Sequence, residues 1–477
     1  MRLAIVGAGW AGLAAAVRAA DQGHDVTVFE ASHVLGGRAR AVESPQLKHR
    51  IDNGQHIMLG AYADTFALMD RLGLDLAGTL QRTPLALESA DGGFRLALPR
   101  LPAPWHLGGA LLAARGLGAR DKLALARIFR ALQRNRWRVE AGTTVARWLR
   151  QHRQGARLQS LFWGPLCVAA LNTPVEQACA QLFANVLRDS LGATPEACDV
   201  VISRADLSSL WPDHVEQMQP AHPHGRIEIR RGQPVRHLEV GKPGVSADMD
   251  APPAATPISG RDGASTISIQ PGVIVNGESF DAVILATNVP SARRLLAQLP
   301  VAPGQTPACH TLMRRLSAFR FIPIATVTLE LEHPWNMPAS MLQLHENRAA
   351  GHYGQWVFNN VAFMAQPAAP MLHIVISDAA QALEMGEAEL VRRLQAQLAE
   401  QGRRFGPLPA VVKHELIAEK RATFAAVPGL ERPQPRTPWP GVLLAGDWTD
   451  TGYPAVLEGA VRSGQAAVAA LACADRT

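Results

Sequence analysis

The order of hydrophobic and polar residues at the start of the chain predicts a strand, a helix and a second strand. A continuous apolar run at residues 2–6 (RLAIV) is typical of a parallel strand that is buried on both faces. A glycine-rich turn follows, and then an Ala-rich stretch that Gly23 closes, as at the end of a helix. Residues 26–29 (VTVF) predict the second strand, and Glu30 follows it. Together these segments predict one complete βαβ unit.

Two kinds of pattern alternate along the rest of the chain. Residues 281–287 (DAVILAT) and 442–445 (VLLA) predict further buried parallel strands, and residues 225–240 predict a pair of strands around a turn. Residues 319–378 carry longer stretches that are typical of an antiparallel sheet, and residues 158–191 have a helical pattern. The alternation indicates that one domain is assembled from separate stretches and that a second domain is inserted between them.

The length of the chain agrees with such a division, because 477 residues exceed what one core usually holds. We expect the first domain to comprise residues 1–75, 222–305 and 420–477, and the inserted domain to comprise residues 76–221 and 306–419. Residues 241–268 are rich in Pro, Ala, Gly and Ser, so we expect a flexible surface insertion there.

Composition excludes several classes of protein. The chain is 47% hydrophobic and 18% charged, which is typical of a globular protein and unlike a disordered or fibrous one. The net charge of +6 is too diffuse to indicate nucleic-acid binding. The five cysteines lack metal-ligand or disulfide spacing, so we expect no metal site. The apolar stretches are shorter than a spanning helix, and no signal-peptide pattern precedes the first strand, so we expect a cytoplasmic protein.

The turn of the βαβ unit carries the pattern GxGxxG, which in this context predicts a dinucleotide site. Gly7 permits the tight turn, Gly9 lets a pyrophosphate approach the backbone together with Ala8, and Gly12 lets the helix pack on the strand. The helix N-terminus stabilises the phosphate charge, and Glu30 is placed to accept a hydrogen bond from a ribose hydroxyl. We therefore expect an α/β fold with a Rossmann-like domain.

A second glycine element suggests that the dinucleotide is FAD. Gly36, Gly37 and Arg38 follow Glu30 closely, where backbone and a guanidinium can both reach a diphosphate. In this position the element resembles the GR2-type flavoproteins of the amine oxidase and phytoene desaturase superfamily. No second GxGxxG follows a strand, so a separate NAD(P) domain is not expected. The resemblance implies a GR2-type FAD-binding domain with an inserted α+β substrate domain, an antiparallel sheet plus helices.

The C-terminal part points to flavin independently. A Gly-Asp turn, Gly446-Asp447, follows the predicted strand, and its carboxylate can reach the ribityl chain. The next helix begins near Val456 and Leu457, so its N-terminal dipole would stabilise the negative charge of reduced flavin. The segment 445–461 resembles carotenoid desaturases, whereas amine oxidases have an aromatic residue in the place of Val456. Since no cysteine lies near this turn, we expect FAD to be bound non-covalently.

The segment 52–56 (DNGQH) is the third landmark, and in the superfamily the matching segment runs beside the flavin ring. Gly54 and Gln55 are accordingly expected to contact the cofactor, and Val235 is assigned to the same site. His56 has two interpretations, a hydrogen-bonded structural residue or a proton donor near the substrate. We nominate it as the candidate catalytic acid.

Three motifs together resemble one family more closely. They are DNGQH with the residues behind it, residues 162–173 (FWGPLCVAALNT) and residues 419–424 (EKRATF). They resemble the bacterial hydroxysqualene dehydroxylases, also called squalene-associated flavin-dependent desaturases, which belong to hopanoid biosynthesis. The resemblance implies that reduced FAD supplies the electrons to remove the hydroxyl of hydroxysqualene and give squalene. The hydroxyl is allylic, so its loss would leave a delocalised cation for hydride to quench.

The implied partners are an apolar C30 terpenoid and an electron donor that the sequence leaves unknown. Residues 121–138 combine an apolar stripe with five arginines, so they predict either an interfacial helix or an ordinary amphipathic helix packed on the core. The first alternative would place the protein peripherally on the inner face of the bacterial membrane. Three other functions stay open: a carotenoid desaturase, a flavin amine oxidase, and a flavin-stabilised scaffold without catalysis.

Overall fold

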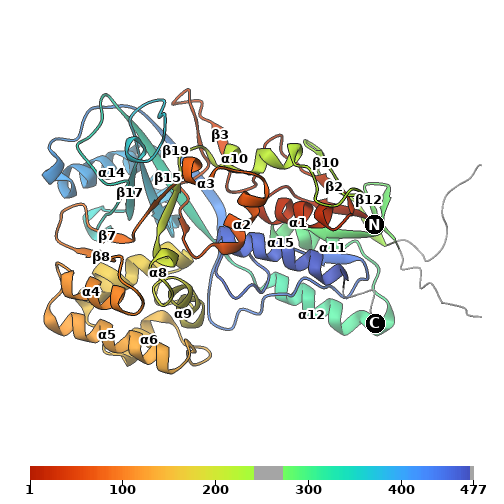
Figure 1. Ribbon diagram of the computed structural model, residues 1–477, viewed down its shortest axis with the longest axis horizontal. Coiled ribbons are helices and arrows are strands. Elements are labelled where there is room, and N and C mark those ends of the chain that lie inside the picture. The colour runs from red at the N-terminus through yellow and green to blue at the C-terminus, as the bar shows by residue number, and fades with distance from the viewer. Residues whose placement is uncertain (241–271, 473–477) are drawn as a thin grey trace, which may run out of the picture.

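One parallel and one antiparallel sheet organise the chain in the computed structural model, which describes residues 1–240 and 272–472 (Figure 1). The insertion predicted at 241–268 lies outside the described residues. Both ends of the described chain lie beside the parallel sheet, and the antiparallel sheet lies at the other end of the molecule (Figure 1). The α/β fold with an inserted α+β part is therefore confirmed.

The parallel sheet has five strands, and every neighbouring pair in it is parallel. Its order is β10 (Arg226–Arg230), β2 (Asp25–Phe29), β1 (Arg2–Val6), β14 (Ala282–Leu285), β20 (Val442–Leu444). The helices α1 (Trp10–Asp21) and α15 (Leu457–Ala472) lie side by side on one face, so close that a Cβ at Gly464 would overlap the carbonyl oxygen of Ala11 (Figure 1). On the opposite side lie α11 (Val289–Leu296) and α12 (Thr306–Ser317).

The prediction that residues 225–240 form two strands paired with each other is wrong. Strand β10 pairs in parallel with β2, whereas β11 (Leu238–Val240) pairs with β12 (Val273–Val275) in a separate sheet that β13 (Glu278–Phe280) completes. Both segments are short, so long-range partners decide where each one pairs. The five parallel strands come from the first, second and third stretches assigned to the FAD domain, and we retain that division of domains as a proposal.

The antiparallel sheet has two different faces. Its order is β16 (Met341–Gln343), β17 (Trp356–Asn359), β18 (Met371–Ser377), β15 (Phe321–Leu331), β19 (Val411–Phe424). Ala325, Val327 and Leu329 of β15 pack with the buried side of α14 (Glu387–Gln401) in one apolar cluster. The alternate residues Thr326 and Thr328 point to the other face, which is turned toward Gly54.

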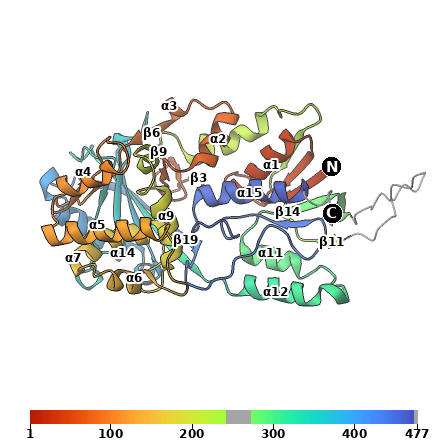
Figure 2. The same cartoon turned by 60° about the horizontal axis from the view of Figure 1, so that its bottom comes forward.

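A layer of helices lies at the end of the molecule far from the termini (Figure 2). It contains α4 (Trp105–Ala113), α5 (Ala119–Arg134), α6 (Val145–Gln151), α8 (Gly164–Leu171) and α9 (Ala180–Asp189). The apolar stripe predicted at 121–138 belongs to α5, and its Leu125, Ile128, Phe129 and Leu132 are buried in the core. Of the two alternatives for this helix, the structure has the core-packed one, and the stripe is not free to enter a membrane.

Shorter elements complete the chain. The helices are α2 (Ala63–Arg71), α3 (Leu76–Thr79), α7 (Ala156–Leu158), α10 (Leu207–Leu210) and α13 (Ala380–Glu384). The strands are β3 (Ala41–Glu43), β4 (Arg50–Asp52), β5 (Met58–Leu59), β6 (Leu80–Thr83), β7 (Ala86–Glu88), β8 (Arg95–Ala97) and β9 (Val200–Ser203). No helix within residues 1–240 and 272–472 is both long and apolar enough to cross a bilayer.

Candidate flavin site

Two glycine loops meet at the carboxyl end of the parallel sheet. The amide of Gly36 donates to the carbonyl oxygen of Ala8 at 2.9 Å, and Gly9 and Gly36 form a parallel bridge. Gly37 has a φ of +65°, and a Cβ on it would lie 3.0 Å from the Cα of Gly9. Only glycine therefore suits position 37, because the two backbones approach too closely for a side chain.

The N-terminus of α1 opens onto this junction. Gly9 is its N-cap residue, so no side chain caps the helix, and the first turn holds no acidic residue. Uncapped amide groups at a helix N-terminus favour an anion. A Cβ built on Gly9 would meet only the Cα of Gly37, at 3.8 Å, so the space above Gly9 is free for a diphosphate. The junction thus fits the pyrophosphate of FAD.

Glu30 lies at the edge of the same loop. Its carboxylate accepts hydrogen bonds from the amides of Ala8 at 2.6 Å and Ser32 at 2.8 Å. Its carbonyl oxygen accepts from the amide of Gln233, which brings the segment with the buried Val235 beside it. Glu30 therefore borders the glycine loop, whereas Val235 follows two residues after Gln233, and the contacts of both residues with FAD stay predictions.

Arg38 joins parts of the chain that lie far apart in sequence. Its guanidinium donates to Asp447 at 2.6 Å, across 409 residues, and to the carbonyl oxygen of Ala422 at 2.6 Å. Burial opposes the charge of Arg38, but the neighbouring Asp447 outweighs it and raises the pKa of Arg38 above its ordinary value. A small cleft lies between Arg38, Asp447 and residues that include Asn288 and Trp448. All three stretches assigned to the FAD domain line this cleft, together with Phe321 of the inserted part.

The Gly-Asp turn leads to the N-terminus of α15. The amide of Gly446 donates to the hydroxyl of Ser463 at 2.9 Å, which ties the turn to that helix. Val456 precedes the helix and Leu457 begins it, as expected. The next residue, Glu458, is 1% exposed and accepts hydrogen bonds from the backbone amides of Asp64 and Thr65, so it caps α2. Its role is structural.

The structure changes the interpretation of His56. Its Nδ1 lies 2.7 Å from the carbonyl oxygen of Gly54, so Nδ1 carries the proton and Nε2 is an acceptor. Burial lowers the pKa of His56, against the hydrogen bond to Gly54. In a neutral ring of this tautomer Nε2 accepts, so the acid role of His56 would require the protonated ring, and that role stays a prediction. The side-chain amide of the nearby Gln55 donates to the carbonyl oxygen of His56 at 3.4 Å.

Sequence reasoning missed a second imidazole, that of His373 on β18. It lies directly opposite Thr328 of β15, and its Nδ1 is 3.0 Å from the Thr328 hydroxyl. Two positions along β15 lies Thr326, whose hydroxyl is 3.7 Å from a Cβ built on Gly54, so His373 shares the face of the sheet that is turned toward Gly54. Burial lowers the pKa of His373 to about 4. The only signal in the sequence is a histidine within a strongly apolar strand.

Tyr453 does not act as a free aromatic residue near the flavin. Its hydroxyl donates a hydrogen bond to the carboxylate of Asp189 and accepts one from Arg462 at 3.1 Å. The guanidinium of Arg462 also lies 4.8 Å from the centre of its ring. With Val456 in the position where amine oxidases have an aromatic residue, the described chain does not offer an aromatic pair there.

The segment 162–173 connects the helical layer to the strands around the cleft. Its Asn172 has a φ of +45° and closes α8. The side-chain amide of Asn172 donates to the hydroxyl of Thr423 at 2.9 Å and to the carbonyl oxygen of Ile322 at 3.2 Å. Its oxygen accepts from the amide of Asp378. Asn172 therefore joins α8 to the long strands β15 and β19, so this motif has a structural role.

Asp52 gives a prediction for stability. Burial raises its pKa from 3.8 to about 7, although the amide of Leu207 donates to it at 2.8 Å. Because folding destabilises the charged form, stability is lost as pH rises from about 4 toward 7 and then stays level. Asp52→Asn keeps the acceptor oxygen but removes the charge. Since a difference of one pKa unit corresponds to ~1.4 kcal/mol, we expect the variant to be more stable than the wild type at pH 8 by about 1–2 kcal/mol. Urea unfolding at pH 5 and pH 8 measures this, and an equal change at both values would contradict it.

Comparisons with known proteins identify the family of the chain. The family described as "Flavin containing amine oxidoreductase" matches residues 10–472. A hydroxysqualene dehydroxylase of Rhodopseudomonas palustris is 30% identical over 99% of this chain and 98% of its own length. A probable zeta-carotene desaturase of Synechococcus elongatus is 23% identical over 99% and 98%. An oxidoreductase from Methanosarcina mazei has a similar structure, with a TM-score of 0.69 at 14% identity, covering 99% of this chain and all of the other.

These matches confirm the predicted family and the predicted cofactor. The full-length match to the dehydroxylase is stronger than the match to the desaturase, and the glycine junction, Arg38 and the α15 N-terminus fit FAD. The chain therefore belongs to the hydroxysqualene dehydroxylases within the flavin containing amine oxidoreductases, and it is an FAD-dependent oxidoreductase.

Proposed function

We propose that this enzyme reductively removes the hydroxyl group of hydroxysqualene and releases squalene. The observation that carries the proposal is the full-length match to hydroxysqualene dehydroxylase, together with a cradle that suits FAD in three separate stretches of chain. The overall change consumes one hydride and one proton, breaks the C–O bond, forms a C–H bond and releases water. Bound FAD in its reduced form supplies the hydride.

The face of the antiparallel sheet that is turned toward Gly54 forms the substrate wall. Trp356 and Phe358 of β17 and Val375 of β18 share this face with His373 and belong to, or pack against, one large apolar cluster. An apolar wall excludes water and nucleophiles that would trap an allylic cation. It therefore suits the proposed loss of the hydroxyl group as water from a long apolar substrate.

His373 supplies the polar group that this wall needs. When the Thr328 hydroxyl donates to Nδ1, the Nε2–H of His373 is a donor with no other hydrogen-bond partner among the described residues. In the proposed reaction it donates a hydrogen bond to the hydroxyl oxygen and orients it, and the proton that completes the departing water comes from the medium.

The test of this proposal is a reaction under anaerobic conditions. Purified protein with photoreduced FAD is incubated with hydroxysqualene, and the products are extracted and analysed for squalene. We expect squalene to form only when hydroxysqualene is the substrate. Conversion of phytoene by the oxidised enzyme would favour a carotenoid desaturase instead, and peroxide formed with amines would favour an amine oxidase.

The remaining partners belong to the same proposal. The substrate is an apolar C30 terpenoid, which partitions into membranes, so the enzyme works in the cytoplasm at the inner face of the bacterial membrane. The second partner is an electron donor, which reduces FAD again after each turnover. The unpaired arginines of α5 support a membrane position, although its apolar stripe is buried.

A further inference from the structure

Helix α4 and its surroundings expose an unusual amount of apolar surface. Within the described residues, the three most exposed large apolar side chains are Leu112 (82%), Trp105 (70%) and Leu123 (58%). Leu112 and Trp105 lie on α4, and Leu123 lies on the adjacent α5. The sequence of α4, WHLGGALLA, contains no charged residue. Single exposed apolar residues are ordinary, but a group of this kind marks an interaction site.

Positive charge borders this apolar surface. Residues 100–138 contain nine Lys and Arg but only one acid, Asp121. Seven of these arginines have no ion pair with a carboxylate in the described part of the chain: Arg115, Arg120, Arg127, Arg130, Arg134, Arg136 and Arg138. Exposed apolar residues flanked by unpaired cations complement an anionic bilayer. They do not complement a second copy of the same face, because its like charges would repel.

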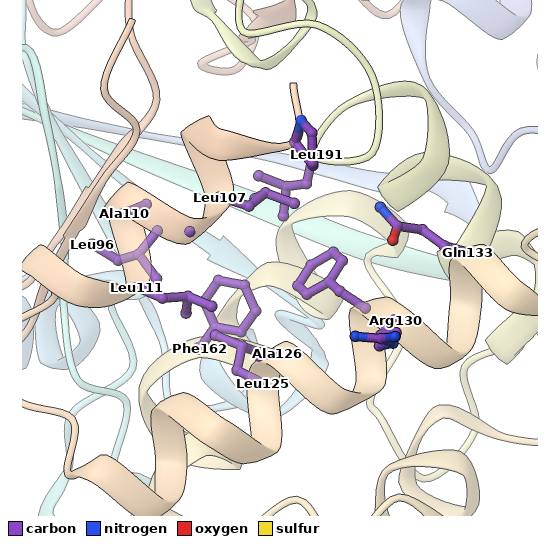
Figure 3. A pocket seen from close by; sticks show the side chains of 13 residues that line it. Leu96, Leu107, Ala110, Leu111, Leu125, Ala126, Arg130, Gln133, Phe162 and Leu191 are labelled. Carbon is purple, nitrogen blue, oxygen red and sulfur yellow. The ribbon is translucent and has the colours of Figure 1, made fainter. Parts of the chain in front are cut away.

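A cavity of about 270 Å³ lies between α4 and α5 (Figure 3). Its outer rim includes the exposed Pro104, Gly108 and Ala126, and its inner end includes the buried Phe162 and Leu191. Figure 3 shows Leu111 of α4 and Leu125 of α5 beside Phe162, with Arg130 and Gln133 together at one side. Whole small-molecule ligands usually occupy roughly 300–1,000 Å³, so this cavity suits one portion of a long apolar chain.

The inner end of the cavity borders a helix that contacts the loop before α15. Leu191 closely follows α9, where Asp189 is bonded to the hydroxyl of Tyr453. Asn185 of the same helix donates to the carbonyl oxygen of Gly452 at 2.7 Å. Both contacts are to the loop that precedes the N-terminus of α15. Helix α9 therefore links the inner end of the cavity to the loop that precedes α15.

We propose that the exposed face of α4 inserts into an anionic bilayer and that the α4–α5 cavity receives one end of the isoprenoid chain from the lipid. The second part rests on the proposed function. The surface differs from the one predicted from the sequence, because the apolar stripe of α5 is buried and α4 supplies the apolar contact. The arginines of α5 remain at the surface to bind lipid headgroups.

Flotation with vesicles tests the surface. We compare the wild type with Leu112→Asp and with the control Val412→Asp, which introduces the same charge at a residue that is 56% exposed on β19. Phosphatidylglycerol vesicles should bind the wild type and the control, and Leu112→Asp should bind about tenfold less, since both apolar area and charge contribute. Binding to neutral phosphatidylcholine should be weak, and binding to anionic vesicles should fall in high salt. Equal binding by all three proteins, or a dimer broken by Leu112→Asp without any effect on vesicle binding, would overturn the proposal.

Gly108 allows the cavity itself to be tested. It lies on the rim, and a Cβ built on it has nothing within 4 Å, so Gly108→Trp fills the opening without an internal clash. Gly304→Trp is the control, because Gly304 is also exposed with nothing within 4 Å. We expect Gly108→Trp to bind labelled squalene, presented in vesicles, about tenfold more weakly, as expected when a pocket is blocked. FAD content should not change, and vesicle binding should not fall, because the added tryptophan enlarges the apolar surface of α4.

The two readouts separate this inference from the proposed function. Unchanged binding of labelled squalene by Gly108→Trp would overturn the assignment of the cavity. A wild type that binds vesicles and squalene but does not convert hydroxysqualene would leave the inference standing and refute the proposed reaction.

Discussion

Replacing Gly9 by valine should remove FAD from the protein while leaving the chain folded. The φ of Gly9 is −75° and its ψ is 176°, an extended conformation that any residue adopts. A Cβ there meets no protein atom closer than 3.8 Å, so the added group lies in the space that the pyrophosphate needs. We expect FAD affinity to fall by roughly 100-fold, or about 2.7 kcal/mol. Absorbance of the purified protein near the flavin bands and titration with FAD measure this.

Gly118→Val is the matched control for this prediction. Gly118 is the N-cap residue of α5, with a φ of −77° and a ψ of 168°, so the change there has the same backbone cost. The control should keep its FAD, and Gly9→Ala should give an intermediate loss. If Gly9→Val and Gly118→Val retained equal amounts of FAD, the pyrophosphate would not lie over Gly9.

His373→Phe should lower kcat by about 10²-fold, the range typical of a lost hydrogen-bond donor that stabilises the transition state. Phenylalanine fills the position but cannot donate to the substrate hydroxyl. His373→Gln should recover part of the rate, because its amide can donate a hydrogen bond. Thr328→Val should have a smaller effect, since it removes only the hydrogen bond that orients the ring of His373. Rapid-mixing measurement of flavin oxidation by hydroxysqualene gives kcat separately from substrate binding.

His414→Phe is the control for His373, because His414 lies on β19 with its side chain 41% exposed. It should keep full activity. A His373→Phe enzyme with the wild-type kcat would remove this imidazole from the mechanism. If FAD content fell in His373→Phe but not in His414→Phe, the effect would be on cofactor binding and not on the hydroxyl.

The parts of the fold that could be predicted are those encoded by neighbouring residues. The βαβ unit, its glycine turn and the helix of α15 each lie within one short stretch, so periodicity and turn residues suffice. The pairing of residues 225–240 depends on β2 and β12, which lie elsewhere in the chain, and local patterns carry no information on such partners. The same limit explains why the bond between Arg38 and Asp447 emerges only in the structure.

The candidate site was predictable for the cofactor and less so for the substrate. Glycine loops must have glycine for backbone approach, so they leave a clear signal, as at Gly37. The amphipathic pattern of α5 is the same whether its apolar side faces a core or a bilayer, and the structure shows the core. His373 could not be identified, because a strand pattern does not state which face meets the cofactor.

One measurement tests the central claim, that reduced FAD on this protein delivers a hydride to the carbon that carried the hydroxyl. The enzyme is photoreduced anaerobically in D₂O, so that the transferable hydrogen of the flavin is deuterium, and it is then mixed with unlabelled hydroxysqualene. Mass spectrometry of the extracted squalene should find one deuterium at that carbon, with the second deuteron leaving in water. Squalene without deuterium, or no squalene at all from fully reduced enzyme, would contradict the account.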